Sequence, residues 1–282
     1  MTFGLGIISY CGWLRCDKLL ESLKFNDVKI PITVFEDLSP YPEMTARYQH
    51  VCDKHAGHNS LGWSVSLSTA TEWGSIQGNA NRAMRELDYD VIILLSDDVM
   101  GTPHAIDNMV YFWENNPGIK LGGVLFSRLE AVHLVRDGYL RSEREFYALD
   151  LNNIPPSPDC IEPKIIHSLH GSACAISKKL YNEVGGFAPS HWAFDEDISW
   201  QMWLNTDYIC CIIPGNPMVH LGGASQPSNE HAELRGADQR ELAGKDWGIP
   251  YPEINKKVML AVEEKQAAYN AILKGAKTYQ TK

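Results

Sequence analysis

Apolar residues recur along the chain in two alternating patterns, continuous runs and stretches with helical spacing. Continuous runs, typical of strands buried on both faces, occupy residues 5–10, 30–35, 91–95, 121–126 and 208–213. Helical spacing is found at residues 18–23, 43–55, 79–87 and 103–115. This alternation predicts an α/β fold with a doubly wound, mostly parallel sheet, whose ligand crevice lies beyond the carboxyl ends of the strands.

Two adjacent carboxylates follow the most continuous of these runs. Val91–Leu95 leads directly into Ser96, Asp97 and Asp98. A divalent cation carrying a phosphorylated substrate would balance such a pair, because Mg²⁺ and Mn²⁺ prefer oxygen ligands. The alternative is that Ser96 and Asp97 cap the next helix. With the sheet order expected here, Ser9 and Asp37 should lie at the same edge as Asp97.

The second half of the chain carries further polar groups at the ends of predicted elements. Asp195, Glu196 and Asp197 precede an apolar helix, and His220 ends a short strand. Between them and the first half, the prolines of residues 155–158 predict a loop, within a stretch (128–165) that suits a lid or a substrate-specific insertion. Residues 254–272 have helical spacing and predict an amphipathic tail helix.

Composition narrows the class of protein. The 282 residues are 44% apolar, and no apolar run reaches the length of a membrane span. Seven cysteines without a Cys-x-x-Cys pair fit a reducing compartment, so we expect a soluble cytoplasmic protein. The formal net charge of −10 disfavours a broad electrostatic grip on nucleic acid.

The order of these pieces resembles the family 2 type of nucleotide-sugar glycosyltransferases, which have the GT-A fold, over roughly residues 3–225. The motifs that carry the resemblance are Ile8-Ser9-Tyr10, Phe35-Glu36-Asp37, Asn81-Arg82, Ser96-Asp97-Asp98, Gly185-Gly186-Phe187 with Asp195-Glu196-Asp197, and Val219-His220-Leu221-Gly222-Gly223. The chain departs from the family pattern at Ile8, where a proline is usual, at Cys11, where an asparagine is usual, and at Gly74, which is displaced by about one residue.

The resemblance implies a donor site and a metal. Ser9, Tyr10, Asn81 and Arg82 would bind the nucleotide sugar, with Asp37 on the nucleobase and Asp97 on the ribose. Asp98 would bind Mn²⁺ or Mg²⁺ on the diphosphate, and His220 would be a further metal ligand. A UDP-sugar is the default donor of the family.

The resemblance also implies the chemistry of transfer. Asp197, with Glu196 beside it, would be the catalytic base that deprotonates the acceptor hydroxyl, and this geometry gives inversion; a retaining enzyme stays an alternative. His191 and Trp192 lie where an acceptor sugar ring could stack, although core packing explains Trp192 equally well. The acceptor would be a glycan, a protein, a lipid-linked oligosaccharide or a hydroxymethylated DNA base.

Without the family, simpler explanations exist for each group. Glu196 and Asp197 would stabilise a helix N-terminus, and His220 would be a half-buried histidine. A nucleotidyltransferase would need a basic glycine-rich loop, of which Gly12 and Arg15 are a poor version, and a non-catalytic binding protein is the third alternative. Cys52, His55 and His58 could bind zinc but have no evident fourth ligand.

The expected domain organisation is a single GT-A domain with a C-terminal extension. Residues 1–100 would form the nucleotide-sugar-binding half and residues 101–235 the acceptor-binding half. Residues 236–282 would form a loop and the tail helix, which either packs back on the domain or forms a homodimer.

Overall fold

A mixed eight-stranded sheet forms the centre of the molecule. The computed structural model describes residues 1–39, 41–56, 63–72, 75–130, 148–154, 160–187, 194–221 and 247–279. The strands of this sheet are β1 (Phe3–Ser9), β2 (Ile32–Glu36), β3 (Val65–Thr69), β4 (Val91–Ser96), β6 (Leu121–Leu125), β8 (Lys164–Ile165), β9 (Ala173–Ser177) and β10 (Ile209–Ile212). Their order is β3-β2-β1-β4-β9-β6-β10-β8.

The direction of the strands confirms a mostly parallel sheet. β3, β2, β1 and β4 run parallel, and so do β6 and β10, whereas β9 is antiparallel to both of its neighbours. Every residue of Val91–Leu95 in β4 is at most 1% exposed. A strand in the middle of a sheet covered on both faces has no polar side, which explains the continuous apolar run.

A second sheet of three strands stands beyond the carboxyl end of β4. Its order is β5 (Val99–Gly101), β11 (Met218–His220) and β7 (Arg128–Glu130). β5 follows Asp98 directly, so Ser96 and Asp97 do not cap a helix, and that alternative is wrong. The strand expected at residues 218–221 therefore belongs to this small sheet and not to the main sheet.

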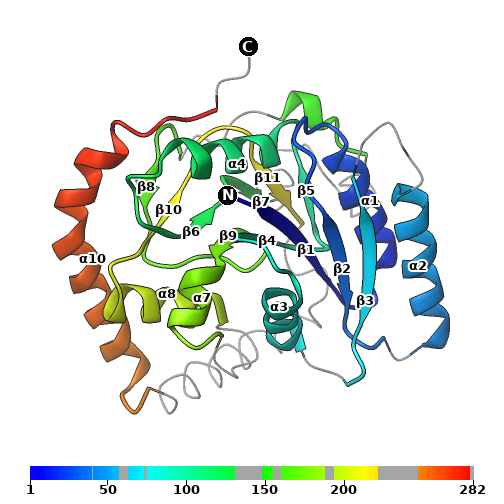
Figure 1. Cartoon of the computed structure of the whole chain (residues 1–282), viewed down its shortest axis with the longest axis horizontal. Coiled ribbons are helices and arrows are strands. Elements are labelled where there is room, and N and C mark those ends of the chain that lie inside the picture. The colour runs from blue at the N-terminus through cyan, green and yellow to red at the C-terminus, as the bar shows by residue number, and fades with distance from the viewer. Residues whose placement is uncertain are drawn as a thin grey trace.

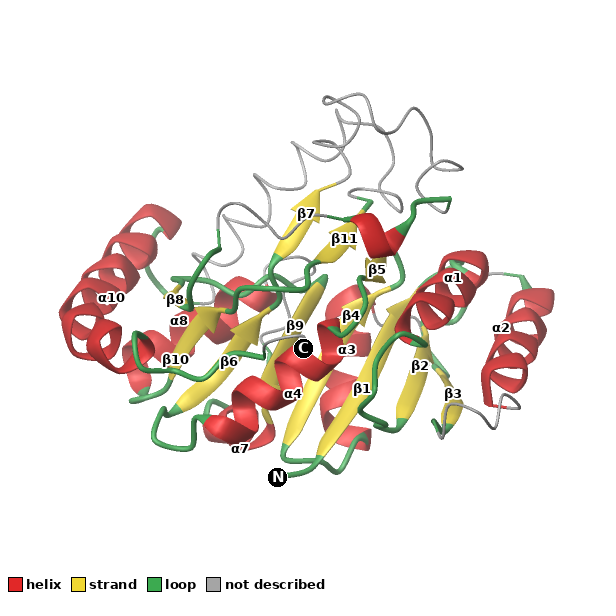
Figure 2. Ribbon diagram, turned by 90° about the horizontal axis from the view of Figure 1, so that it is seen from above, coloured by secondary structure: helices red, strands yellow, loops and turns green. Residues whose placement is uncertain are grey.

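Helices cover both faces of the main sheet. They are α1 (Trp13–Leu23), α2 (Pro42–Ala56), α3 (Ser75–Glu86), α4 (Ala105–Asn115), α7 (Lys178–Glu183), α8 (Phe194–Asn205) and α10 (Tyr251–Leu273), with a short 3₁₀ turn η1 at Leu151–Asn153. Figure 1 shows α4 on one side of the sheet and α3, α7 and α8 on the other. The view from above shows α10 at the end of the sheet near β8 and β10, and α2 at the opposite end near β3 (Figure 2).

The tail helix packs back on the domain, as one of the two expectations had it. The ammonium group of Lys265 donates hydrogen bonds to the carbonyl oxygens of Trp203 (3.1 Å) and Thr206 (2.7 Å) in and after α8. Ile254, Val258 and Val262 are buried in the same core as the sheet. These three positions of α10 are thus used inside one chain, whereas Met259, Leu260 and Ile272 on the same helix are exposed.

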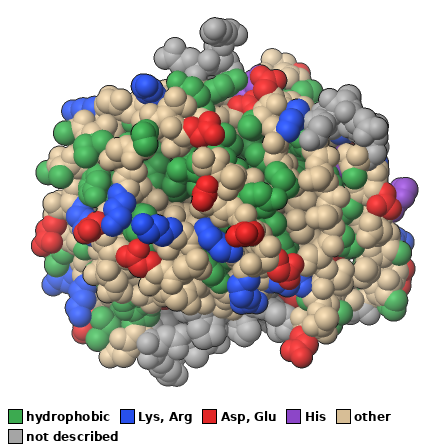
Figure 3. All heavy atoms as spheres, in the orientation of Figure 1, with side chains coloured by type: hydrophobic (Ala, Val, Ile, Leu, Met, Phe, Trp, Pro, Cys, Tyr) green, Lys and Arg blue, Asp and Glu red, His purple; other side chains and the backbone are tan. Residues whose placement is uncertain are grey.

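The surface carries no single broad charged area on the face shown in Figure 3, where Lys and Arg side chains alternate with Asp and Glu. In the part of the chain that the structure describes, no helix has both the length and the apolar character that a membrane crossing needs. All seven cysteines are free thiols, and all except Cys11 are buried.

Candidate active site

Asp98 and His220 meet where the two sheets join. β11 pairs antiparallel with β5 so that His220 stands opposite Val99, and the N–H of Leu221 donates to the carbonyl of Asp98 (2.9 Å). This register leaves Nε2 of His220 3.5 Å from Oδ2 of Asp98. Burial acts to raise the pKa of Asp98, but the hydrogen bond and charge of His220, followed by the hydrogen bond from Ser96, outweigh it and keep the pKa below its usual value.

A turn before β9 completes the surroundings of this pair. The carbonyl of Ser172 accepts from the backbone N–H of Ser96 (2.9 Å), so the turn is fixed to the end of β4. The ring of His170 lies edge-on to that of His220, with centroids 5.8 Å apart. The hydroxyl of Ser172 accepts from Nη1 of Arg128 (3.0 Å) and lies 2.8 Å from Nδ1 of His170. Neither His170 nor Arg128 was selected from the sequence: His170 follows no apolar run, and Arg128, two residues after the run 121–126, belongs to no recognisable motif.

Asp97 is held by an internal ion pair. Oδ1 of Asp97 accepts from Nε of Arg15 (3.0 Å), and Oδ2 accepts from Nη2 of Arg15 (3.4 Å) and from the hydroxyl of Ser9. Burial raises the pKa of Asp97 to about 6, against the opposing charge of Arg15. The hydroxyl of Tyr48 links the end of β1 to the start of α1, because it accepts from the N–H of Gly12 (2.7 Å) and lies 2.6 Å from the hydroxyl of Ser9. The expected contact between Ser9 and Asp97 is therefore confirmed. Arg15 is a further partner of Asp97 that the sequence did not identify.

The ends of β1 and β2 have unusual backbone conformations. Cys11 has φ 51° and Leu38 has φ 31°, although neither is a glycine. The N–H of Asp37 donates to the carbonyl of Ser9 (3.0 Å), which brings the two strand ends side by side. Left-handed conformations at non-glycine residues cost energy, and among the described residues only His104, at the start of α4, shares this feature with them (φ 62°).

Apolar surface surrounds Asp37 at this edge. Tyr10 is 41% exposed, Leu38 42% and Tyr41 55%, whereas Asp37 itself is 3% exposed. Burial raises the pKa of Tyr10, and the nearby Cys11 and Asp37 act in the same direction. The arrangement offers flat apolar faces beside a buried carboxylate.

Arg82 reaches the end of β2 from α3. Its Nη2 donates to the carbonyls of Glu36 (2.8 Å) and Ser68 (3.0 Å), and its guanidinium lies over the ring of Phe35 at 5.5 Å. Among the described residues, the buried Nε and Nη1 of Arg82 and the buried Oε2 of Glu36 have no hydrogen-bond partner. Burial lowers the pKa of Arg82.

Asn81 serves a different part of the chain. Its side chain donates to the carbonyl of Phe187 (3.3 Å) and accepts from the N–H of Phe187 (3.2 Å) and the hydroxyl of Tyr181 (2.7 Å). Gly185 and Gly186, just before Phe187, have φ 84° and 91°, which only glycine adopts readily. The Asn81 amide thus holds the Gly-Gly-Phe turn in place.

The three acids at the start of α8 point to three different partners. Oδ2 of Asp195 accepts from the N–H of Gly171 (2.8 Å), in the same turn as His170. The hydroxyl of Tyr251 donates to Glu196 (3.3 Å to Oε2), and the indole N–H of Trp247 donates to Oδ1 of Asp197 (2.8 Å). Burial raises the pKa of Asp195 to about 6. Trp247 and Tyr251 come from the C-terminal extension, and nothing in the sequence connected them with these acids.

Two other predicted groups can be placed only in part. His191 and Trp192 lie outside the described residues, and so does His58. Of the remaining zinc candidates, Nε2 of His55 lies 2.7 Å from Oδ1 of Asp17, whereas Sγ of Cys52 donates to the carbonyl of Ser66 (3.7 Å). The two side chains therefore have separate partners.

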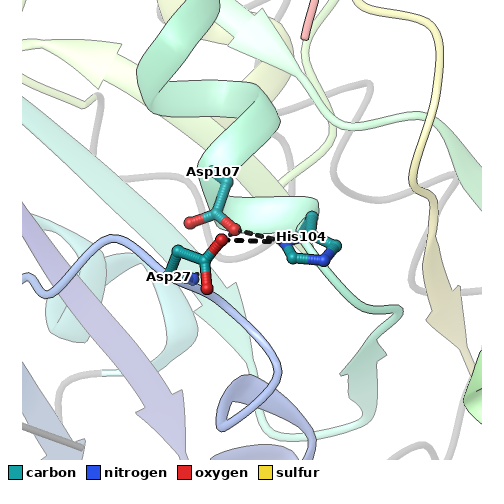
Figure 4. Close-up of side chains that lie close together, drawn as sticks. All are labelled: Asp27, His104 and Asp107. Atoms are coloured by element: carbon teal, nitrogen blue, oxygen red, sulfur yellow. Dashed lines mark hydrogen bonds and ion pairs between the residues drawn. The ribbon is translucent and has the colours of Figure 1, made fainter. Parts of the chain in front are cut away.

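A second group of possible metal ligands lies away from β4, among the described residues. The ligand atoms of Asp27, His104 and Asp107 lie within 4.8 Å of one another (Figure 4). Asp107 accepts from the backbone N–H of Asp27 (2.9 Å) and of Val28 (2.7 Å), and it lies 2.7 Å from Nδ1 of His104. These bonds already fix the loop before β2 to the start of α4, which gives the group a structural role.

Comparison with known proteins supports the fold rather than a close relationship. No protein-family model and no curated protein matches the sequence. Among solved structures, the S. aureus TarS fragment 1–349 in complex with UDP-GlcNAc has a TM-score of 0.56 at 13% identity, over 83% of this chain and 61% of that one. The chain has the GT-A glycosyltransferase fold.

Two further GT-A structures agree with this. GalNAc-T7 with UDP, GalNAc and Mn²⁺ has a TM-score of 0.55 at 13% identity, over 78% of this chain and 44% of that one. Mannosyltransferase PcManGT from Pyrobaculum calidifontis, in complex with GDP-Man and Mn²⁺, has a TM-score of 0.59 at 15% identity, over 94% and 75%. The chain thus spans about three-fifths of the TarS fragment and less than half of GalNAc-T7.

Proposed function

We propose that this GT-A chain is a metal-dependent glycosyltransferase that moves a sugar from a nucleoside-diphosphate sugar to a hydroxyl acceptor, with inversion. The observation that carries the proposal is the meeting of Asp98 and His220, which are far apart in the chain and lie at the edge where the acids of α8 also begin. A carboxylate and an imidazole held this close, both nearly buried, need a shared proton or a cation between them.

The donor set of this pair fits a divalent cation. Asp98 supplies a hard oxygen, which Mn²⁺ and Mg²⁺ both prefer, and His220 supplies an imidazole nitrogen. Mn²⁺ bound there would offset the charge of the leaving diphosphate as a Lewis acid. Ser96 supports the assembly, because its hydroxyl donates to Oδ1 of Asp98 and thereby limits the rotation of the carboxylate.

The polar groups at the end of β2 favour particular nucleobases. Asp37 can accept an N–H from a base, and the N–H groups of Arg82 that are buried without a partner would donate to a base carbonyl once the side chains that cover them move aside. Uracil (O4 and N3–H) and guanine (O6 and N1–H) both present a carbonyl next to an N–H, whereas cytosine and adenine present an amino group next to a ring nitrogen acceptor. Tyr10 and Tyr41 offer exposed aromatic faces for stacking. We therefore expect UDP-sugars or GDP-sugars as donors.

The base that we assign is Asp197. The acceptor hydroxyl gives its proton to the Asp197 carboxylate while its oxygen attacks the anomeric carbon, and the bond between that carbon and the diphosphate oxygen breaks, so the configuration inverts. General base catalysis of this kind contributes about 10² to 10⁴-fold. Asp195 is the competing candidate, because its pKa of about 6 lies in the range of a working base.

The test separates binding from chemistry. Asp197→Asn and Asp195→Asn are compared with the unaltered chain for calorimetric affinity of UDP-GlcNAc, UDP-GalNAc and GDP-mannose with Mn²⁺, and for hydrolysis of the bound donor by water at saturation. We expect Asp197→Asn to keep donor affinity and lose at least about 100-fold in turnover, and Asp195→Asn to stay within about 10-fold.

The products distinguish the rival functions. A glycosyltransferase releases nucleoside diphosphate and sugar, a nucleotidyltransferase yields pyrophosphate from a nucleoside triphosphate and a sugar phosphate, and a binding protein releases nothing. Full turnover in Asp197→Asn with loss in Asp195→Asn would move the base to Asp195, and binding of every donor without any turnover would refute an enzyme.

A further inference from the structure

The C-terminal extension reaches the acids of α8 through two polar groups. Nε1 of Trp247 donates to Oδ1 of Asp197 at 2.8 Å, and the hydroxyl of Tyr251 donates to Oε2 of Glu196 at 3.3 Å. Both donors belong to a segment that lies 50 or more residues after α8 begins and outside the stretch that resembles the glycosyltransferase family. Asp197 is 4% exposed, so water has little access to its carboxylate, and protein donors determine how its oxygens are hydrogen-bonded.

The segment that carries these donors is anchored along its whole length. The rings of Trp247 and Tyr251 pack edge-on against the buried ring of Trp200, at centroid distances of 6.0 and 5.3 Å. Further along α10, the hydroxyl of Tyr269 donates to the carbonyl of Asp207 (3.0 Å). After the helix, the N–H of Lys277 donates to the side chain of Asn116 (2.8 Å), whose amide returns a hydrogen bond to the Lys277 carbonyl (2.9 Å).

Ring packing alone would not require either polar contact. A phenylalanine at position 251 would bury a similar apolar area against Trp200, and one at position 247 would keep an aromatic contact there with a smaller ring. The indole N–H adds direction, because it donates to one oxygen of Asp197, and the phenol hydroxyl holds the Glu196 carboxylate through both of its oxygens (3.3 and 3.5 Å). A carboxylate that must accept a proton from a defined direction works only within a narrow range of orientations.

We propose that the C-terminal extension is part of the catalytic apparatus, with Trp247 as a positioning residue for Asp197 and Tyr251 as a positioning residue for Glu196. This inference rests on the proposed function, in which Asp197 is the base. The extension then determines the rate of the chemical step and leaves donor binding, which takes place at the ends of β1, β2 and β4, unchanged. A transferase that lost the register of α10 on α8 would bind its nucleotide sugar and fail to transfer it.

Trp247→Phe tests the indole N–H while keeping the ring against Trp200. We expect turnover at saturating donor to fall about 10-fold to 100-fold, the range that corresponds to losing a hydrogen bond to a charged group, with donor affinity within twofold. Trp113→Phe is the matched control, because Trp113 on α4 is also buried and its indole N–H has no hydrogen-bond partner among the described residues. The control should leave turnover unchanged.

Tyr251→Phe provides an independent variant if Trp247→Phe does not fold. It should lower turnover about 3-fold to 10-fold, since the bond to Glu196 is longer. Tyr269→Phe, on the same helix, removes a hydroxyl that donates to a backbone carbonyl and should not change turnover. Unaltered turnover in both Trp247→Phe and Tyr251→Phe, or an equal loss in the controls, would overturn the inference.

A double variant separates this inference from the proposed function. In an Asp197→Asn background, adding Trp247→Phe should cost no further activity, because the two groups act through one carboxylate. If Asp197→Asn alone keeps full turnover, the assignment of the base is wrong. If Asp197→Asn is inactive but Trp247→Phe is fully active, the base stands and the positioning role is refuted.

Discussion

Arg15 is the residue on which the folded arrangement of the β4 carboxylates depends most directly. Its guanidinium makes two of the hydrogen bonds to Asp97, and the side chains of the pair are only 15% and 7% exposed. Arg15→Met keeps the aliphatic stem and removes the charge, which leaves Asp97 buried beside Asp98 without its cation. Breaking a buried pair by removing one partner costs about 3 to 5 kcal/mol.

The partial exposure of Arg15 places our expectation at the lower end, about 3 kcal/mol. For a chain of this size each kcal/mol shifts the melting temperature by about 2 to 4 °C, so Arg15→Met should melt about 6 to 12 °C lower in a thermal scan without nucleotide or metal. Lys18→Met is the matched control on the same helix, because the Lys18–Glu21 pair is 37% and 47% exposed. The control should cost less than about 1 kcal/mol.

A second substitution identifies the cause of the loss. Asp97→Asn in the Arg15→Met background removes the unpaired charge and retains an acceptor for the hydroxyl of Ser9, so it should restore at least half of the lost melting temperature. A loss in Arg15→Met no larger than in Lys18→Met would refute the reasoning. The same conclusion would follow if the double variant melted lower than Arg15→Met.

Three further predictions follow from the site. Asp98→Ala should fold normally and lose the Mn²⁺-dependent part of the stabilisation by nucleoside diphosphate, about 2.7 kcal/mol at 100 times the Kd in a thermal-shift titration, and retained Mn²⁺ dependence would contradict the metal assignment. Because burial raises the pKa of Asp195 from 3.8 to about 6, the folded chain binds its proton more tightly than the unfolded chain, and stability is lost as the pH rises through this window. In denaturant titrations, the stability of Asp195→Asn relative to the unaltered chain should therefore rise between pH 4 and pH 7. A shift of two pKa units corresponds to about 3 kcal/mol, and we expect about half of this because the side chain is partly exposed. A stability difference between the two chains that does not change with pH would disprove this. Gly12→Ala would place a Cβ 1.8 Å from Oδ2 of Asp97 and should destabilise the chain by about 1 to 3 kcal/mol in the same titrations. Unchanged stability would show that the side chains around Gly12 can move aside without cost.

The order of elements and the sheet edge of the site were readable from the sequence. Val91–Leu95 is typical of a strand covered on both faces, and polar residues placed directly after such a strand are expected at the carboxyl edge. The expected meeting of Ser9 with Asp97 follows from the same rule, because β1 and β4 are parallel neighbours. Periodicity is a local property, so it survives in the sequence whatever the tertiary fold does with it.

The pairing of groups across the site was decided by tertiary structure alone. His220 meets Asp98 through the antiparallel register of β11 on β5, and a shift of one residue would have turned the imidazole to the opposite face of the small sheet. Trp247 meets Asp197 because α10 returns along α8, in a segment with no motif of its own. Such contacts join positions far apart in the chain, where the sequence pattern carries no information on distance, so only the packing of whole elements determines which side chains come together.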